Sequence, residues 1–92
     1  MADPRPDLDR RAMDTAKVLL AVIEKNALVM SADQRVSEVD AARLIGMEAG
    51  SLKNLRTEGG APPNYRVPVN GHRISYRVLD LALWIEGKRE DW

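Results

Sequence analysis

Hydrogen-bonding side chains gather in one short segment, residues 48–57, whose composition is typical of a helix. If Leu52 and Leu55 face the protein core, the opposite side of this helix exposes polar side chains. Lysine can address guanine in the major groove of DNA, asparagine can address adenine, and serine or threonine can address either base. An arginine at the border of such a face is suited to a phosphate. The segment therefore predicts a helix that reads DNA bases, and its candidate contacts are Ser51, Lys53, Asn54, Arg56 and Thr57.

The pair Asn70-Gly71 is the strongest short-range hairpin signal in the chain, because it lies between two runs of alternating residues. A two-residue turn fixes the register of the two strands. Pro68 cannot donate a ladder hydrogen bond, so it marks an edge strand and favours a two-stranded projection. We expect three facing pairs on the apolar side: Val69 with His72, Val67 with Ile74, and Tyr65 with Tyr76.

The other face of this predicted hairpin carries basic side chains, together with Pro68 and Ser75. A slim basic hairpin can contact phosphates or enter the minor groove of DNA. Alternatively, surface strands carry arginine for solubility and to discourage edge-to-edge pairing. The candidate DNA contacts of the hairpin are Arg66, His72, Arg73 and Arg77.

The residues that catalysis or metal binding would need are missing from the sequence. The chain has no cysteine and only one histidine, His72, so neither a thiolate site nor a usual histidine set can form. Acidic residues are scattered singly, and Gly59-Gly60 lacks the Lys-Ser/Thr ending of a phosphate-binding loop. The sequence therefore predicts a protein that is not an enzyme and that has no metal and no cofactor.

Three helices are expected to position these side chains, over about residues 38–45, 48–57 and 78–88. Ser37 is suited to cap the first helix, with Asp40 completing a variant capping box. Gly46 ends the first helix and Gly59 the second. Aromatic residues on the apolar faces, Tyr76 and Trp84, are assigned to packing. The residues of the third helix that we expect to be mostly buried are Leu79, Ala82, Leu83 and Ile85.

The segment 8–30 contains no Gly or Pro and predicts one long N-terminal helix. Apolar residues recur along it at spacings of three and four, and they form a stripe that must be buried. Two partners for this stripe remain open, the core of the same chain and a second subunit. Residues 1–7 and 89–92 are expected to be flexible tails. The candidate oligomerisation residues are Ala16, Leu20, Ile23, Ala27 and Met30.

Composition limits the chain to a single small domain, because 92 residues with 45% hydrophobic content suffice for one core. The net charge is zero, but residues 34–77 hold seven Lys and Arg against four Asp and Glu. This local excess permits a phosphate-binding face on a neutral molecule. No segment is apolar enough for a membrane span or a signal peptide, so we expect a soluble cytoplasmic protein with no membrane partner.

The expected order of elements is helix, tight turn, helix, Gly-Pro break, hairpin and helix, all within residues 35–88. This order is that of a winged helix-turn-helix. The expected fold is therefore mostly α, with a two-stranded β-hairpin wing and an extra N-terminal helix. In such a module the second helix enters the major groove while the wing grips phosphates. Double-stranded DNA is the expected partner.

The stretch 36–87 resembles the MerR-like winged helix-turn-helix of bacterial and phage excisionases, which are also called recombination directionality factors. Two positions depart from the pattern, because Leu55 stands where many members have Trp, and Gly50 is unusual at the start of the second helix. The resemblance rests on Ala41-Ala42 before Leu44-Ile45-Gly46, the run Ser51-Leu52-Lys53-Asn54-Leu55-Arg56, the Gly and Pro break, and the closing Tyr76-Arg77, Asp80-Leu81 and Trp84.

This resemblance implies an accessory protein of a phage or integrated mobile element, acting at the nucleoid in the bacterial cytoplasm. Such proteins bind repeated sites near an attachment site, often cooperatively and head to tail, bend the DNA and bias an integrase towards excision. Self-association and an integrase are therefore implied partners. The resemblance assigns base reading to Ser51, Lys53, Asn54 and Arg56, and wing contacts to His72 and Arg73.

Two other classes of protein remain open. A small phage or plasmid transcriptional repressor uses the same module as a symmetric dimer on a palindrome, whereas an excisionase needs direct repeats and an open-ended contact between copies. A module that binds only proteins would leave Lys53 and Arg73 without an energetic role.

Overall fold

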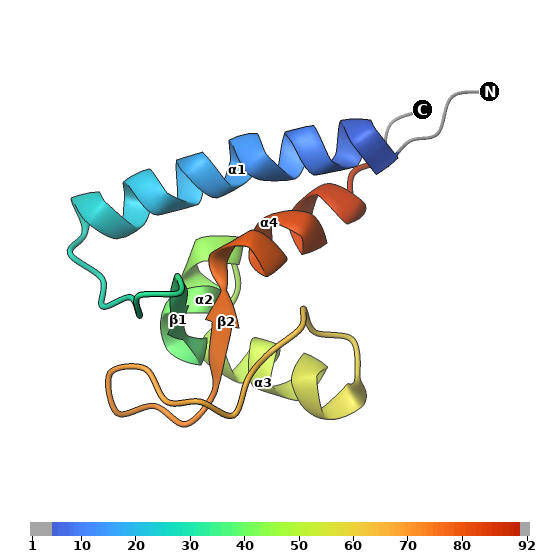
Figure 1. The fold of residues 1–92 in the computed structure, drawn as a ribbon. Helices are drawn as coiled ribbons and strands as arrows, with labels where there is room; N and C mark the ends of the chain where they lie inside the picture. The colour runs from blue at the N-terminus through green and yellow to red at the C-terminus, as the bar shows by residue number, and fades with distance from the viewer. Residues whose placement is uncertain (1–4, 91–92) are drawn as a thin grey trace.

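The computed structural model describes residues 5–90, which form four α-helices and one two-stranded antiparallel sheet (Figure 1). Val36 pairs with Tyr76 in the sheet, so the sheet joins segments that lie far apart in the sequence. None of the helices in this part of the chain is long and apolar enough to cross a membrane. In chain order the elements are α1 (Arg5–Lys25), β1 (Arg35–Ser37), α2 (Glu38–Ile45), α3 (Ala49–Glu58), β2 (Ser75–Arg77) and α4 (Val78–Gly87).

The helices and the sheet are arranged in layers (Figure 1). α1 packs along α4 on one side of the molecule, and α2 and the sheet occupy the middle. α3 packs on α2 and lies on the opposite side, together with the loop that leads into β2. The side of the molecule that carries α3 is therefore remote from α1.

The helices α2, α3 and α4 follow the predicted spans to within one residue. Ser37 Oγ accepts a hydrogen bond from the N–H of Asp40 at 3.2 Å, so α2 begins at the predicted cap. Gly46 ends α2 and Gly59 ends α3, with φ values of 85° and 84°. This left-handed conformation is one that glycine adopts without a steric penalty.

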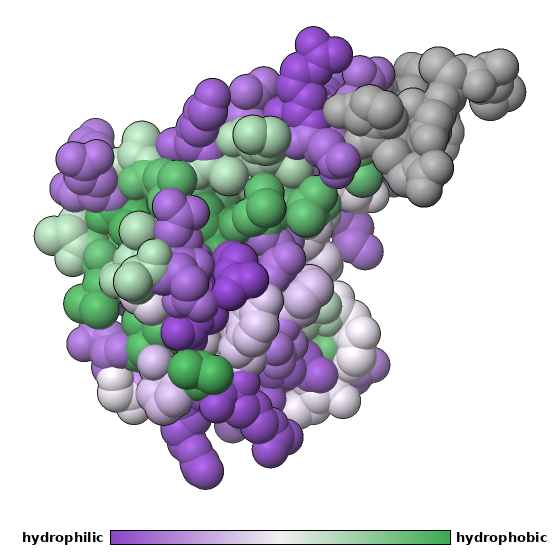
Figure 2. All heavy atoms as spheres, in the orientation of Figure 1, coloured by the Kyte–Doolittle hydropathy of each residue, from purple (hydrophilic) through white to green (hydrophobic). Residues whose placement is uncertain are grey.

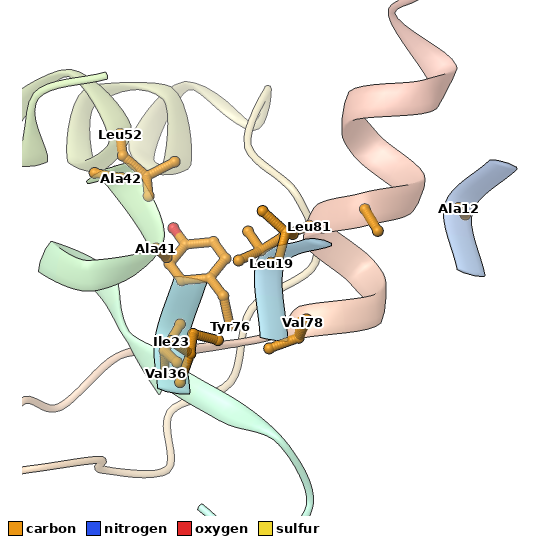
Figure 3. Close-up of a cluster of buried hydrophobic side chains, with 11 residues drawn as sticks. Ala12, Leu19, Ile23, Val36, Ala41, Ala42, Leu52, Tyr76, Val78 and Leu81 are labelled. Carbon is orange, nitrogen blue, oxygen red and sulfur yellow. The ribbon is translucent and has the colours of Figure 1, made fainter. Parts of the chain in front are cut away.

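Tyr76 is fully buried, and Figure 3 shows its ring among side chains from α1, α2 and β1. The prediction that Tyr76 packs internally is confirmed, and Trp84 on α4 is half-buried. Leu79, which we expected to be buried, is 42% exposed, whereas Ala82 is fully buried and Leu83 and Ile85 pack partly buried against the core, as predicted. The fully buried residues of α4 are Val78, Leu81 and Ala82.

The two predicted tails are shorter than expected or lie outside the described residues. α1 begins at Arg5, so residues 5–7 of the predicted N-terminal tail are helical. Residues 1–4 and 91–92 lie outside the described part of the chain. Arg89 and Glu90 follow α4 without regular secondary structure.

The predicted apolar stripe of the N-terminal helix is divided by the true end of that helix. α1 ends at Lys25 rather than at residue 30, because Ala27 adopts a φ of 52° and the chain turns there. The N–H of Leu28 bonds back to the carbonyl of Ile23, as in a Schellman ending without glycine. Ala27 and Met30 therefore lie beyond the helix. Burial against the core of the same chain was one of the two alternatives for this stripe. The stripe residues that pack there are Ala16, Leu20 and Ile23.

The predicted hairpin is a loop with two isolated bridges rather than two continuous strands. We call residues 65–74 the basic loop, because this segment contains two arginines and no acidic residue. At its tip, the predicted bridge between Val69 and His72 is confirmed. At its base, Tyr65 pairs with Ser75 rather than with Tyr76, so the predicted register is wrong by one residue.

The shift in register has a cause that lies outside the loop. Tyr76 pairs instead with Val36 of β1, a strand that the sequence did not predict. Between its two bridges the first arm of the loop holds one residue more than the second, as in a bulge. The predicted pairing of Val67 with Ile74 is therefore absent, and Ser75, expected on the outer face, is buried.

Truncation of Leu52 is expected to destabilise the fold strongly. Leu52 is fully buried between α3 and the core, so Leu52→Ala leaves a cavity that costs about 2–5 kcal/mol. Leu79→Ala is the matched control, because Leu79 is 42% exposed; its cost should be about 1 kcal/mol or less. Urea unfolding of the two variants measures this difference, and equal losses would contradict the packing described above.

Candidate nucleic-acid interface

A groove of about 580 Å³ lies between α3 and the basic loop. α3 contributes two cationic side chains to its lining, and the loop contributes two arginines and the histidine. The structure thus brings together two groups of candidate residues that the sequence placed in separate elements. We call this feature the basic groove, and its lining residues are Glu38, Lys53, Arg56, Arg66, Pro68, His72, Arg73 and Ile74.

Three cations of the basic groove form no ion pair within the described part of the chain. They are Lys53, Arg66 and Arg73, and all three are exposed. Like charges gathered around one groove raise the local positive potential, which stabilises an anion placed there. The groove is therefore suited to a phosphate or another polyanionic group.

The remaining candidates of α3 lie outside the lining of the groove but on the solvent side of the helix. Ser51, Asn54 and Thr57 are all exposed, as predicted. Thr57 Oγ1 donates a hydrogen bond to the carbonyl of Asn54 at 2.9 Å, so its hydroxyl proton is already engaged. The hydroxyl of Ser51 and the amide of Asn54 make no such contact within the described residues.

Arg56 is held inside the protein instead of projecting freely from α3. Its Nε donates to Glu38 Oε2 at 2.7 Å, and its Nη2 donates to Glu38 Oε1 at 3.1 Å. The hydroxyl of Tyr76 donates to the same Oε2 at 2.7 Å. This two-point contact fixes α3 against the start of α2. Arg56 therefore has a structural role that the sequence did not indicate, and only its remaining donors are left for a ligand.

The contacts among Glu38, Arg56 and Tyr76, which we call the Glu38 cluster, explain the pKa shifts of these three groups. Burial alone would raise the pKa of the Glu38 carboxyl, but hydrogen bonds from Arg56 and Tyr76 outweigh burial and lower that pKa below its ordinary value. The carboxylate in turn raises the pKa of Arg56. Burial, followed by the hydrogen bond to Glu38, raises the pKa of the Tyr76 hydroxyl. The cluster thus holds an ionised carboxylate at neutral pH.

Arg77 lies apart from the basic groove in a second charge cluster. Its Nη2 donates to Asp33 Oδ2 at 3.0 Å, and its guanidinium lies 5.0 Å from the centroid of the Tyr65 ring. Arg35 Nε donates to both oxygens of Asp33, at 2.9 and 3.0 Å. These bonds, above all those from Arg35, hold the pKa of Asp33 well below its ordinary range. The structure therefore does not bring Arg77 together with the other candidates.

Arg35 also ties the basic loop to β1. Its Nη1 donates to the carbonyl of Val67 at 3.1 Å and to Ser75 Oγ at 2.7 Å. Ser75 Oγ donates to the same carbonyl at 2.6 Å. At the bulge, these side-chain bonds take the place of the backbone ladder that a regular hairpin would have. Arg35 is only 11% exposed, and it fixes the loop against β1.

Several of the acidic and basic residues that hold this arrangement together could not be recognised from the sequence. No role was assigned from the sequence to Asp33, Arg35 or Glu38. The dense alternation of charge over residues 33–38 was the available signal. Their partners Arg56 and Arg77 are distant in sequence, so only the tertiary fold identifies them.

Comparison of the chain with protein-family models, with curated proteins and with solved structures finds no match. Within residues 5–90, no group of three or more His, Cys, Asp or Glu side chains is placed to hold a metal ion. The interface is therefore characterised by its geometry and charge alone.

Loss of the Glu38 carboxylate should destabilise the protein in a pH-dependent way. Because the pKa of Glu38 is lower in the folded state, its stabilising contribution is present above the unfolded value, near 4.5, and is lost as pH falls through the folded value. Glu38→Gln should cost about 1–3 kcal/mol at pH 7. The difference in unfolding free energy between the unmodified protein and Glu38→Gln, measured from pH 7 to pH 3, should therefore become smaller in acid.

If this difference in unfolding free energy stayed constant with pH, the assignment of Glu38 as an ionised partner of Arg56 and Tyr76 would be contradicted. Glu58→Gln is the matched control, because Glu58 is exposed at the end of α3 and forms no ion pair with the described residues. Its effect should be about 0.5 kcal/mol or less.

Replacement of Arg35 by methionine should loosen the basic loop while leaving the helices intact. Methionine fills much of the same space but donates no hydrogen bond, so the carbonyl of Val67 loses one of its two donors. Amide exchange at Val69 and His72 should accelerate about tenfold or more. Arg43→Met, at an exposed arginine of α2, is the control. Unchanged exchange at both loop amides would show that Arg35 does not position the loop.

Proposed function

We propose that this protein is a sequence-specific DNA-binding protein of the winged helix-turn-helix type, without catalytic activity of its own. In this proposal α2 and α3 form the helix-turn-helix, α3 enters the major groove, and the basic loop is the wing. The observation that carries the proposal is the basic groove, where Lys53, Arg66 and Arg73 converge from two elements without forming an ion pair in the described chain.

The zero net charge of the chain is compatible with this function because charge is distributed unevenly over the molecule. Asp33 is paired with Arg35 and Arg77, and Glu38 is paired with Arg56. These pairs are formed within the protein, so they cancel little of the field from the three unpaired cations around the groove. A phosphate backbone approaching this side of the molecule meets net positive charge.

The exposed side of α3 supports base reading by a subset of the predicted residues. Lys53 and Asn54 are exposed and carry the groups that address guanine and adenine, and Ser51 carries a hydroxyl suited to either. Arg56 is assigned to positioning because Glu38 holds its guanidinium. Arg66, His72 and Arg73 are assigned to phosphate or minor-groove contacts.

Within this class, the resemblance of residues 36–87 to excisionases favours a recombination directionality factor of a phage or integrated mobile element. Its partners would be double-stranded DNA, further copies of itself and an integrase, in the bacterial cytoplasm. It would bind repeated sites near an attachment site and bend the DNA. A dimeric transcriptional repressor, which needs a symmetric contact between subunits on a palindrome, is the second candidate.

A footprint of the purified protein on DNA flanking its own gene and the nearest attachment site tests this proposal. Protection that spreads over direct repeats as concentration rises would support the excisionase. One palindromic footprint over a promoter would favour the repressor instead. No protection at low salt would refute DNA binding itself.

Lys53→Ala and Arg73→Ala should weaken DNA binding in different ways. Loss of a base contact by Lys53 should reduce affinity for the specific site by about 10- to 100-fold and affinity for random DNA much less. Loss of a phosphate contact by Arg73 should reduce affinity for all sequences and flatten the salt dependence by about one unit. Binding isotherms over a salt series separate the two effects.

Lys17→Ala is the matched control for these two variants, since Lys17 is an exposed lysine on α1, remote from the basic groove. If Lys17→Ala weakened binding as much as Lys53→Ala, the assignment of the interface to α3 would be wrong.

A further inference from the structure

The side of α1 that faces away from the core carries exposed residues at regular spacings. They recur at spacings of four and three, which places them along one side of a helix. The core-facing residues of the same helix, Ala12, Leu19 and Ile23, occupy the opposite side. We call this set the outer face of α1, and it consists of Asp14, Val18, Ala21, Val22 and Lys25, all exposed.

The two valines of the outer face are exposed to solvent in the single chain. Val18 is 62% exposed and Val22 is 39% exposed. Val22 also lines an adjacent groove of about 640 Å³, together with Leu19, Leu28 and Leu44. In Figure 2, apolar side chains lie among hydrophilic ones at the left of the molecule, where α1 ends. Exposed apolar side chains one helical turn apart, beside such a groove, are suited to contact with another molecule.

The charges at the two ends of the outer face indicate what covers it. Asp14 lies towards one end and Lys25 towards the other, with the apolar residues between them. Neither of the two forms an ion pair with another residue in the described chain. The outer face is therefore complementary to its own copy when the copy runs in the opposite direction.

We propose that two copies of this chain associate through the outer face of α1, with the two helices antiparallel. In this arrangement Val18 faces the partner's Ala21, and Asp14 faces the partner's Lys25. The twofold axis passes between Val18 and Ala21, so each contact occurs twice, as in an isologous dimer. The valines supply the apolar contact, and the two ion pairs set direction and register.

A parallel pairing of the same helices is disfavoured by charge. In register, it would place Asp14 against the partner's Asp14 and Lys25 against the partner's Lys25. Like charges opposed across an interface destabilise it, so the same residues that favour the antiparallel dimer act against the parallel one.

The dimer would hold two basic grooves on opposite sides of the assembly. α1 lies on one side of each subunit, and α3 and the basic loop lie on the other (Figure 1). Joining two subunits through α1 therefore turns the grooves away from each other. The dimer itself does not depend on the proposed function. If the proposed function holds, each dimer binds two separate segments of duplex and brings them together.

Sedimentation of the full chain over a concentration series, without DNA, tests the association. The unmodified protein should shift from monomer to dimer as concentration rises. Val18→Asp buries a charge at the centre of the seam and should raise the dissociation constant at least about tenfold. Met13→Asp is the matched control, because Met13 is 59% exposed on a different side of α1 and should leave the dimer unchanged.

Charge exchange tests the direction of the helices. Asp14→Lys and Lys25→Asp should each weaken self-association, whereas a mixture of these two variants should form a heterodimer and the double variant should recover the dimer. A protein that stays monomeric at every concentration, or a dimer that tolerates Val18→Asp, would overturn the proposal. A dimer without recovery in the double variant would overturn the antiparallel arrangement. Since no DNA is present, these outcomes are independent of whether the protein binds DNA.

Discussion

Three segments of the chain meet at the carboxylate of Glu38. Glu38 begins α2, and its carboxylate accepts two hydrogen bonds from Arg56 of α3 and a third from Tyr76 of β2. Because Tyr76 is also fully buried in the core, this one carboxylate connects the packing of the interior to the orientation of the exposed helix. The spacing between α3 and the basic loop, and with it the shape of the basic groove, depends on that connection.

The arginines of the sheet, α3 and the basic loop divide into two groups that differ in their surroundings. Arg35, Arg56 and Arg77 are held by carboxylates and act as cross-links between elements. Arg66 and Arg73 have no such partner in the described chain and face the groove. A bidentate guanidinium is suited to the first task because it fixes both distance and direction, whereas an unpaired one supplies charge to a ligand. Residue type alone therefore does not identify a ligand-binding arginine.

The features that could be predicted from the sequence are those set by short-range chemistry. Ser37, Gly46 and Gly59 mark the ends of α2 and α3 through local hydrogen bonding and backbone conformation, and all three signals were correct. The turn at Asn70-Gly71 was also correct at its tip. The sequence likewise indicated the separate polar faces of α3 and of the loop. Their convergence on one groove followed only from the structure.

The features that were missed all depend on contacts between distant residues. β1 is a strand only because it pairs with β2, and that pairing moves Tyr76 out of the hairpin register. α1 ends at Lys25, and the left-handed turn that follows is made by Ala27 rather than by a glycine, so no local signal marked the end of the helix. This turn allows Leu28 to pack on the core. Likewise, Arg56 matched a base-reading position by pattern, but its pairing with Glu38 across the tertiary fold gives it a structural task.

The way in which the basic loop is attached has a consequence for the evolution of the protein. Between residues 66 and 73 only Val69 is buried, and Arg35 secures the loop through a backbone carbonyl, which every residue type possesses. Most positions of the loop can therefore mutate with little effect on folding, provided that the turn at Asn70-Gly71 is kept. Natural selection can change what the loop contacts while the stability of the scaffold stays the same.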